Sequence, residues 1–307
     1  MNLQQLRYVA EVAQRNLNVS EAARALHTSQ SGVSRQISLL ESELGVDVFI
    51  RQGKRLVAMT RPGEEVVAIA RRMLRDMGAL RQVGEEYAVG ERGRLTIAMT
   101  HTQARYVLPR ILPEFMRAHP EVKVALHQGN PTQCCEYVLS GEADLAIATE
   151  AIDEYDQLVS LPCYQWNRCL ITPPGHPLLD ETPLTLAAIA EWPLITYDFA
   201  FTGGSTVNRA FAAQSLSPNI MLSAIDADII KTYVSLGLGV GIVAQMAFDP
   251  EQDRTLRALD CAHLFEPSTT RIGLHRNAWL RGYTYDFIEQ FASALSREVV
   301  DQALGRG

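Results

Sequence analysis

The residues whose types and spacing first indicate a chemical role lie between positions 30 and 44. An apolar stripe at helical spacing runs through Val33, Ile37, Leu40 and Leu44. A second face of this expected helix, about 140° away at roughly 100° per residue, carries Ser31, Ser34, Arg35 and Ser38. Short side chains would let the helix enter the major groove of DNA, where arginine pairs with guanine or phosphate and Ser or Gln30 donates hydrogen bonds. A solvated helix face could have the same composition, so this helix alone leaves the two interpretations even.

The segment after this helix has the pattern of a β-hairpin with a basic tip. Residues 48–51 and 56–59 are apolar and β-prone, and they flank a glycine and two cations. Arg51, Lys54 and Arg55 are therefore candidate contacts to flanking phosphates or the minor groove. A basic hairpin after three helices predicts a winged helix-turn-helix, which favours DNA binding over a solvated face.

Two earlier helices must position this surface. Leu3, Leu6, Ala10 and Ala13 recur at helical spacing and predict the first helix. The second is expected to begin with Ser20 as its N-cap. Ser29 is the expected N-cap of the third helix, and Gly45 suits the left-handed position that ends it. Residues 1–60 are thus predicted to form the DNA-binding domain.

Residues 61–90 have the pattern of one long helix. Apolar positions recur every three or four residues over more than 20 residues, at Val66, Ala70, Met73, Met77, Leu80 and Tyr87. A helix of about 27 residues would extend about 40 Å, too far for one small domain to cover. We expect it to pair with a second copy as a linker and dimerisation helix; folding back on the rest of its own chain is the alternative.

The pattern changes to α/β from Leu95 onward. β-prone runs alternate with helical segments, which predicts mostly parallel sheets with covering helices. The alternation restarts near Cys169 and near Pro193, which is too much for one small sheet. We therefore expect residues 91–307 to form two lobes with a cleft between them: lobe I from about 91–163 and 268–307, and lobe II from about 164–267.

The composition is that of an ordinary globular protein. Of 307 residues, 47% are hydrophobic, and no apolar run approaches a membrane span or a signal peptide, so we expect a cytoplasmic protein. The net charge is −7, but residues 1–61 carry 8 Lys and Arg against 5 Asp and Glu, which suits a phosphate backbone. The odd number of cysteines fits no zinc template and predicts buried thiols, with redox sensing as the alternative; they are Cys134, Cys135, Cys163, Cys169 and Cys261.

The motifs of common enzyme classes are missing from the sequence. It contains no G-x-S-x-G elbow, P-loop or H-E-x-x-H helix, and its histidines have no metal-ligand spacing. The glycine-rich run at 237–241 lies between a helix and a strand, the reverse of the Rossmann order. We expect no catalysis, no metal and no cofactor. The other alternative to a DNA-binding regulator is a free-standing solute-binding protein, but such a protein would lack the N-terminal DNA-binding domain.

Several runs of the N-terminal part together resemble the LysR-type transcriptional regulators. The runs are Ala22–Leu26, Thr28–Ile37, Leu40-Glu41, Leu44-Gly45 and Phe49–Arg51. The resemblance covers residues 1 to about 65 and departs at Ser31-Gly32, where members commonly carry Pro-Ala. It implies a winged helix-turn-helix, a long linker helix and a two-lobed effector domain like a periplasmic binding protein.

The remaining chain resembles the CysB/Cbl branch of that family, which activates cysteine biosynthesis and sulfur assimilation. The matching runs are residues 100–109, 128–131, 148–150 and 197–203. The resemblance implies a ligand site formed by Thr100, Thr102, Gln103, Thr149 and Thr202. The implied effectors are O-acetylserine, N-acetylserine, sulfate or thiosulfate. The predicted ligand residues lie where strands end and helices begin, and such positions favour binding of an anion. The alternative is that the threonines only cap helices.

The resemblance also implies how such a regulator would work. The long helices would pair into homodimers, and effector domains would join these into a homotetramer that bends promoter DNA, with RNA polymerase as a further partner. Ligand would close the cleft and could shift the equilibrium only by its difference in affinity for the two arrangements. A LysR-type regulator of another pathway, with a different small anionic effector, is the alternative that the sequence leaves open.

Overall fold

The computed structural model describes residues 1–53, 55–89, 92–149, 151–198 and 205–306. Its contacts divide the chain into two compact units, Met1–Gly90 and Glu91–Gly307. No helix in these described ranges is long and apolar enough to cross a lipid bilayer.

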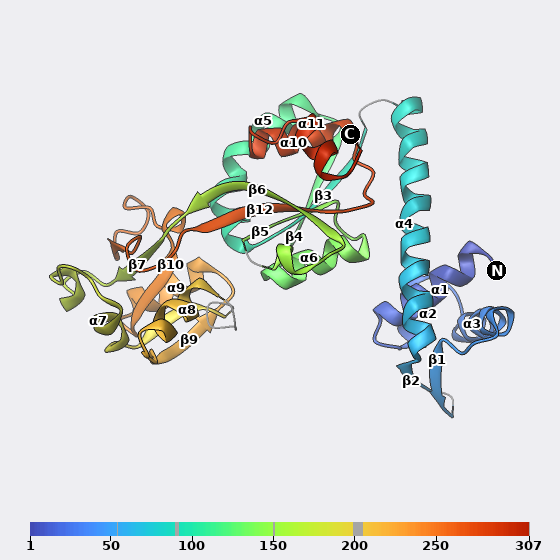
Figure 1. Cartoon of the computed structure of the whole chain (residues 1–307), viewed down its shortest axis with the longest axis horizontal. Coiled ribbons are helices and arrows are strands. Elements are labelled where there is room, and N and C mark those ends of the chain that lie inside the picture. The colour runs from blue at the N-terminus through green and yellow to red at the C-terminus, as the bar shows by residue number, and fades with distance from the viewer. Residues whose placement is uncertain (54, 90–91, 150, 199–204, 307) are drawn as a thin grey trace. The chain divides into compact units, whose positions relative to one another are not determined.

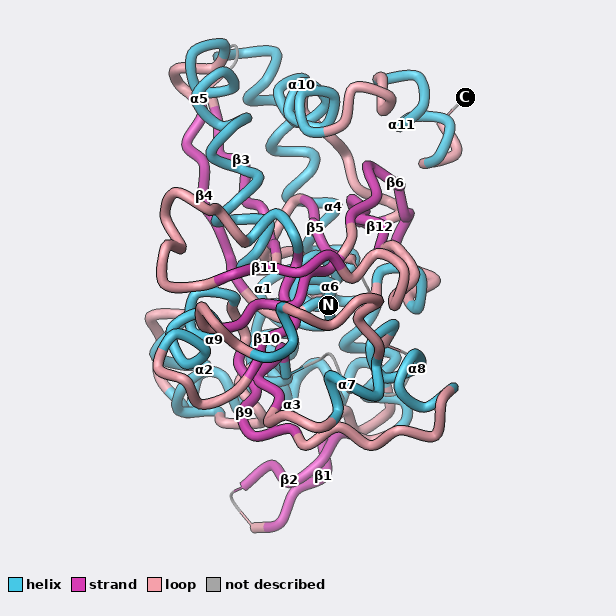
Figure 2. Tube along the Cα trace, turned by 90° about the vertical axis from the view of Figure 1, so that its left-hand side faces the viewer, coloured by secondary structure: helices cyan, strands magenta, loops and turns pink. Residues whose placement is uncertain are grey.

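The first unit is a helical domain with a projecting β-hairpin (Figures 1 and 2). In chain order its elements are α1 (Leu3–Gln14), α2 (Val19–Ala25), α3 (Gln30–Leu44), β1 (Phe49–Gln52), β2 (Arg55–Met59) and α4 (Arg61–Val89). Its core joins the apolar faces of α1, α2 and α3 to the start of α4, through buried residues such as Val9, Val33, Ile37, Leu40 and Val67. The predicted winged helix-turn-helix is confirmed.

Local capping sets where these helices begin and end. The Ser29 hydroxyl accepts the N–H of Gly32 at 3.1 Å, and Gly45 ends α3 with a φ of 71°, as predicted. The prediction of Ser20 as the cap of α2 is wrong. The Asn18 side chain takes that place and accepts the N–H of Glu21 at 3.1 Å, because Asn caps helices as well as Ser does.

The hairpin and the long helix follow the predicted pattern. β1 and β2 pair antiparallel from Phe49↔Met59 to Gln52↔Arg55, with a register shift between Ile50 and Arg51. The helix α4 has 29 residues, which corresponds to about 43 Å at 1.5 Å per residue.

The second unit contains two five-stranded sheets within the described residues. The sheet of lobe I has the order β4-β3-β5-β12-β6, with β3 (Gly93–Met99), β4 (Val122–Gln128), β5 (Leu145–Ala148), β6 (Leu158–Trp166) and β12 (Ser268–His275). The sheet of lobe II has the order β11-β7-β10-β8-β9, with β7 (Arg168–Thr172), β8 (Leu194–Tyr197), β9 (Ile220–Ala224), β10 (Val240–Ala244) and β11 (Arg257–Asp260).

Both sheets are mixed, so the prediction of mostly parallel sheets is wrong. β3 runs parallel to β4 and β5, whereas β12 runs antiparallel to β5 and β6. In lobe II, β8 is parallel to β9 and β10, while β7 is antiparallel to β10 and β11. The cause lies in β6 and β12: the chain leaves lobe I along β6 and returns along β12, so these paired strands must run in opposite directions (Figure 1).

Helices cover the sheet of lobe I on both faces, as Figure 1 shows. One face carries α5 (Leu108–Ala118), α10 (Gly282–Phe291) and α11 (Arg297–Ala303), and the other carries α6 (Pro131–Ser140). Lobe II packs its own core with α7 (Leu186–Ala190), α8 (Thr206–Ala213) and α9 (Ala227–Ser235). Each lobe therefore has a separate apolar core, and the hinge strands β6 and β12 connect them.

Candidate functional site

The polar face of α3 is accessible along most of its length. Gln30, Ser31, Arg35 and Ser38 are exposed, and Ser34 is half-buried. The opposite stripe is buried at Val33, Ile37 and Leu40, but Leu44, expected to continue it, is exposed. The helix therefore presents a row of short polar side chains around one arginine while its other side is fixed in the core.

The hairpin is attached to α3 by a carboxylate that sequence reasoning missed. Glu41 is only 7% exposed, and its Oε1 accepts the backbone N–H groups of Val48 at 3.0 Å and Phe49 at 3.2 Å. Its Oε2 accepts Nη2 of Arg51 at 2.9 Å. Arg51, predicted to contact DNA, is thus also a link between the hairpin and α3. Its side chain is half-exposed, Arg55 is exposed, and Lys54 lies outside the described residues.

Four of the five predicted ligand residues line one small pocket between the lobes. Thr100, Thr102, Gln103 and Thr149 surround a cavity of about 30 Å³. The other residues that line it are Trp166, Arg168, Thr196, Tyr197, Ser205, Val207 and Ile242. The fifth predicted residue, Thr202, lies outside the described residues.

The sheet of lobe I brings Thr100 and Thr149 together. Thr100 follows β3 and Thr149 follows β5, and these strands are parallel neighbours whose carboxyl ends meet at one sheet edge. A π-helical turn, η1 (Gln103–Val107), continues from there into α5. The single helix expected over 103–118 therefore begins with an irregular turn, a form common at functional sites.

The side chain of Gln103 is fully buried and tied to the hinge strands. Its Nε2 donates to the Thr270 hydroxyl at 3.1 Å, and the Tyr164 hydroxyl donates to its Oε1. Trp166 Nε1 donates to the same Thr270 oxygen at 3.1 Å. Thr270 lies on β12, and Tyr164 and Trp166 lie on β6. Gln103 thus links the pocket wall to both strands that connect the lobes.

Lobe II contributes a buried phenol and a buried cation. The hydroxyl groups of Tyr197 and Thr102 lie 3.4 Å apart, and burial raises the pKa of Tyr197, which keeps it a neutral donor. Arg168 is buried, with its guanidinium 5.0 Å from the centre of the Trp166 ring. A buried guanidinium keeps its charge and favours an anion nearby. Sequence reasoning missed Arg168, since an arginine at a strand start gives no sign of burial.

A polar cluster outside the pocket also joins the lobes. The Tyr106 hydroxyl of η1 donates to Asp228 of α9, and Lys231 lies 3.3 Å from Asp228 and 3.1 Å from Asp253. Burial alone would raise the pKa of Asp228, but hydrogen bonds from Tyr106 and Lys231 outweigh it and hold that pKa below its usual value. The turn that carries Gln103 is thereby also fixed to lobe II.

The five cysteines are free thiols in environments that keep them protonated. Four are buried and Cys163 is half-buried. Burial raises the pKa of each to about 12, which keeps the thiol protonated. Within the described ranges, no cluster of three or more His, Cys, Asp or Glu side chains could hold a metal ion.

Comparison with known proteins matches both units to one family. The model described as "Bacterial regulatory helix-turn-helix protein, lysR family" matches residues 3–64, and the model described as "LysR substrate binding domain" matches residues 88–296. The chain is 52% identical to the HTH-type transcriptional regulator CysB of Burkholderia cenocepacia over 304 residues, which cover 99% of this chain and 97% of that protein. It is also 52% identical to the regulator SsuR of the same organism over 296 residues, 96% of each chain. Among solved structures, the cofactor-binding domain of the Cbl transcriptional regulator has 43% identity and a TM-score of 0.67, covering 70% of this chain and 95% of that one.

Proposed function

The chain belongs to the LysR family of transcriptional regulators, in the branch that contains CysB, SsuR and Cbl, and on this premise we propose that it activates genes of sulfur assimilation and cysteine biosynthesis. It binds DNA through its helix-turn-helix and a small molecule through its effector domain. The proposed effector is O-acetylserine, N-acetylserine, sulfate or thiosulfate. We also propose that residues 1–60 form the DNA-binding domain, 61–90 the linker and dimerisation helix, and 91–307 the effector domain.

The DNA contacts are assigned to the polar face of α3 and to the hairpin. On α3, Gln30, Ser31, Ser34, Arg35 and Ser38 would face the major groove, since most of them are exposed. On the hairpin, Arg51, Lys54 and Arg55 would reach phosphates or the minor groove. The bonds of Glu41 to Val48, Phe49 and Arg51 support this arrangement, because they hold the hairpin in a fixed position beside α3.

The observation that carries the effector assignment is the convergence of Thr100, Thr102, Gln103 and Thr149 on one pocket. Their hydroxyl and amide groups, with the buried charge of Arg168, form a donor set suited to a small anion or the carboxylate of an acetylserine. The fifth proposed ligand residue is Thr202. The pocket itself holds only a few non-hydrogen atoms, which suits sulfate, thiosulfate or one polar group of an acetylserine.

The proposed assembly is a dimer through α4 and a tetramer through the effector domains. Leu80 on α4 is 74% exposed, and Ile69 and Met73 on the same helix are also exposed. Lobe II exposes a further apolar group around β9 and α9, which comprises Ile220, Met221, Ile225, Ile229, Leu236 and Leu238. Exposed apolar side chains on these elements support the proposal that they contact another protein copy.

The proposed signal passes from the pocket to the hinge. A ligand that displaces Gln103 would alter its bonds to Thr270 and Tyr164, and these residues lie on the strands that connect the lobes. Closure of the lobes would then change the spacing of DNA-binding heads in the tetramer. The ligand acts through its difference in affinity for the open and closed arrangements.

Calorimetric titration of the full-length protein with each of the four compounds tests this proposal. We expect binding at micromolar to millimolar concentration by at least one compound, and loss of that binding in Thr102→Ala. Arg276→Gln, on the outside of lobe I, is the control and should bind as the wild type does. Absence of heat with all four compounds would refute the proposed sulfur effectors. It would favour a LysR-type regulator of another pathway, whose effector would be a different small anion.

A further inference from the structure

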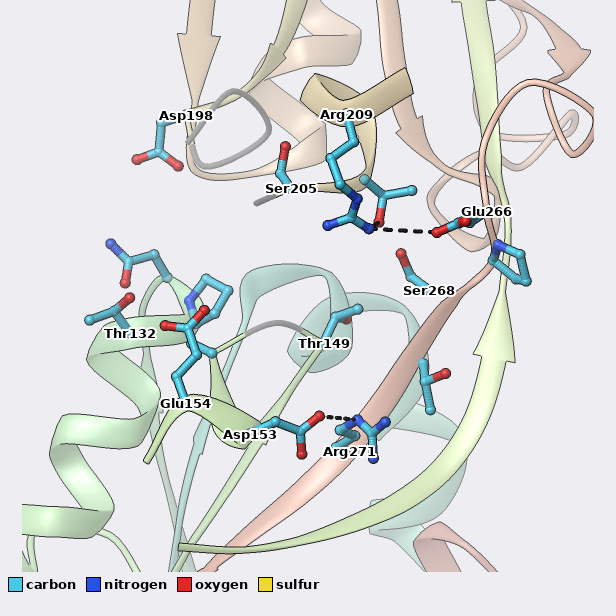
Figure 3. Close-up of a pocket in the computed structure, with 16 residues that line it drawn as sticks. Thr132, Thr149, Asp153, Glu154, Asp198, Ser205, Arg209, Glu266, Ser268 and Arg271 are labelled. Atoms are coloured by element: carbon cyan, nitrogen blue, oxygen red, sulfur yellow. Dashed lines mark hydrogen bonds and ion pairs between the residues drawn. The ribbon is translucent and has the colours of Figure 1, made fainter. Parts of the chain in front are cut away.

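A second, larger cleft lies between the lobes and adjoins the small pocket. Its volume is about 610 Å³, against about 30 Å³ for the pocket. Thr149 of lobe I and Ser205 of lobe II line both cavities, so the two spaces share part of their walls. We refer to the smaller space as the inner pocket and to the larger one as the outer cleft. Figure 3 shows the residues that line the outer cleft.

The outer cleft presents two arginines, each beside a carboxylate. On the lobe I side, Arg271 Nε lies 3.2 Å from Asp153 Oδ2. On the lobe II side, Arg209 Nη2 lies 3.6 Å from Glu266 Oε2. Figure 3 shows the two pairs on opposite walls. The carboxylates of Glu266 and Asp153 are largely exposed, and ion pairs of this kind contribute little to stability. A ligand carboxylate can therefore replace the protein carboxylate beside either arginine.

One buried hydroxyl in the wall has no hydrogen-bond partner within the part of the chain that the structure describes. Ser268 at the start of β12 is 5% exposed, lines the outer cleft, and has no partner for its Oγ among the described residues. Its side chain extends from β12 toward the space below Arg209 (Figure 3). A buried polar group without a partner is costly, and in a cleft wall its natural partner is a bound ligand.

The two volumes differ in what they can hold. The inner pocket has room for only a few non-hydrogen atoms, which suits an inorganic oxyanion or one polar group. The outer cleft falls in the range of roughly 300–1,000 Å³ typical of small-molecule sites. Its mixed charges suit an organic molecule that carries a carboxylate, with or without an ammonium group.

We propose that the inner pocket and the outer cleft form one extended effector site, in which Arg209, Arg271 and Ser268 surround the carboxylate of an organic effector when the two walls close on it. An inorganic oxyanion would occupy the inner pocket alone. The outer cleft thereby distinguishes carboxylate-bearing effectors from sulfate-like ones. This inference rests on the proposed function, because it names how the same site separates the two classes of compound.

Titration of the full-length protein with sodium sulfate and, separately, with O-acetylserine tests the inference. Arg271→Gln and Arg209→Gln should each raise the Kd for O-acetylserine about tenfold or more, while the Kd for sulfate stays within about twofold. Ser268→Ala keeps both charges and should weaken O-acetylserine binding less, by about threefold. Arg254→Gln, an exposed arginine of lobe II outside the cleft, is the matched control and should change neither Kd. Thermal melting of each variant verifies that it is folded.

Competition separates the possible outcomes. Saturating sulfate should raise the apparent Kd for O-acetylserine. Sulfate would fill the inner pocket, which O-acetylserine would also need if the two spaces form one site. Independent binding of both compounds, equal losses for both in the arginine variants, or no loss in any variant would each overturn the inference. If wild-type protein bound sulfate but not O-acetylserine, the inference would fall while the proposed function stood. If it bound neither compound nor N-acetylserine or thiosulfate, the proposed function itself would fail.

Discussion

Removal of the Glu41 carboxylate should release the hairpin from α3. In the structure this buried group accepts the N–H groups of Val48 and Phe49 and pairs with Arg51. Glu41→Ala leaves two buried N–H groups without an acceptor, at about 1–3 kcal/mol each before relaxation. The ion pair adds about 0.5–1 kcal/mol, since the Arg51 side chain is 38% exposed and solvent screens it. We expect a local loss of about 2–4 kcal/mol, because neighbouring contributions do not add fully.

Amide hydrogen exchange read by mass spectrometry measures this loss where it occurs. Peptides that cover residues 46–53 should exchange roughly 30-fold faster or more in Glu41→Ala, since 1.4 kcal/mol corresponds to tenfold. Glu43→Gln is the matched control: it lies two positions away on the same helix, and its side chain is 51% exposed. Unchanged protection of Val48 and Phe49 in Glu41→Ala would refute the anchoring role of the carboxylate.

A double-mutant cycle then decides how Arg51 acts on DNA. The affinity of Glu41→Gln, Arg51→Gln and the double variant is measured by fluorescence anisotropy with a promoter fragment. If Arg51 acts by holding the hairpin to α3, the double variant should be no worse than the worse single variant. If Arg51 contacts DNA directly, as the sequence predicts, the two losses should add.

Four further predictions concern the DNA-binding surface, the hinge and the buried thiols. Arg35→Ala should weaken specific DNA binding by about 1–3 kcal/mol in gel shifts. An unchanged affinity would refute the proposed contact of Arg35 with the major groove. Lys54→Gln should weaken binding to all sequences and flatten its dependence on salt, and a loss confined to one sequence would contradict a phosphate contact. Thr270→Val, which removes the acceptor shared by Gln103 and Trp166 without lining the pocket, should weaken effector binding by about 1–3 kcal/mol; wild-type calorimetry would show that the hinge bonds are dispensable. The free energy of unfolding should fall as pH rises from about 9 toward 12, because the buried thiols keep their protons to a pKa of about 12 when folded but ionise near 9.0 when unfolded; a urea midpoint that is the same at pH 8 and pH 10.5 would contradict this sign.

The predictions that succeeded depend on short stretches of chain. Helical spacing placed Val33, Ile37 and Leu40 in the core and left Arg35 exposed on the other face. The cap at Ser29 and the end at Gly45 follow from side-chain and backbone preferences of one or two residues. Strand ends could likewise be located, which put Thr100 and Thr149 at sheet edges. The error at Ser20 has the same local origin, since Asn18 is an equally good cap only two positions earlier.

The contacts that only the tertiary structure decided join residues far apart in the chain. Gln103 and Thr270 are 167 positions apart, and nothing near either residue indicates that their side chains meet. The burial of Arg168, the burial of the Ser268 hydroxyl and the antiparallel path of β6 and β12 arise in the same way. Periodicity and capping report the interactions of each segment with its immediate neighbours, so the sequence by itself determined the helices, the strand ends and the family. Which side chains share a buried space depends on how whole sheets and helices pack, and that is why the hinge bonds, the place of Arg168 in the inner pocket and the outer cleft came from the folded chain alone.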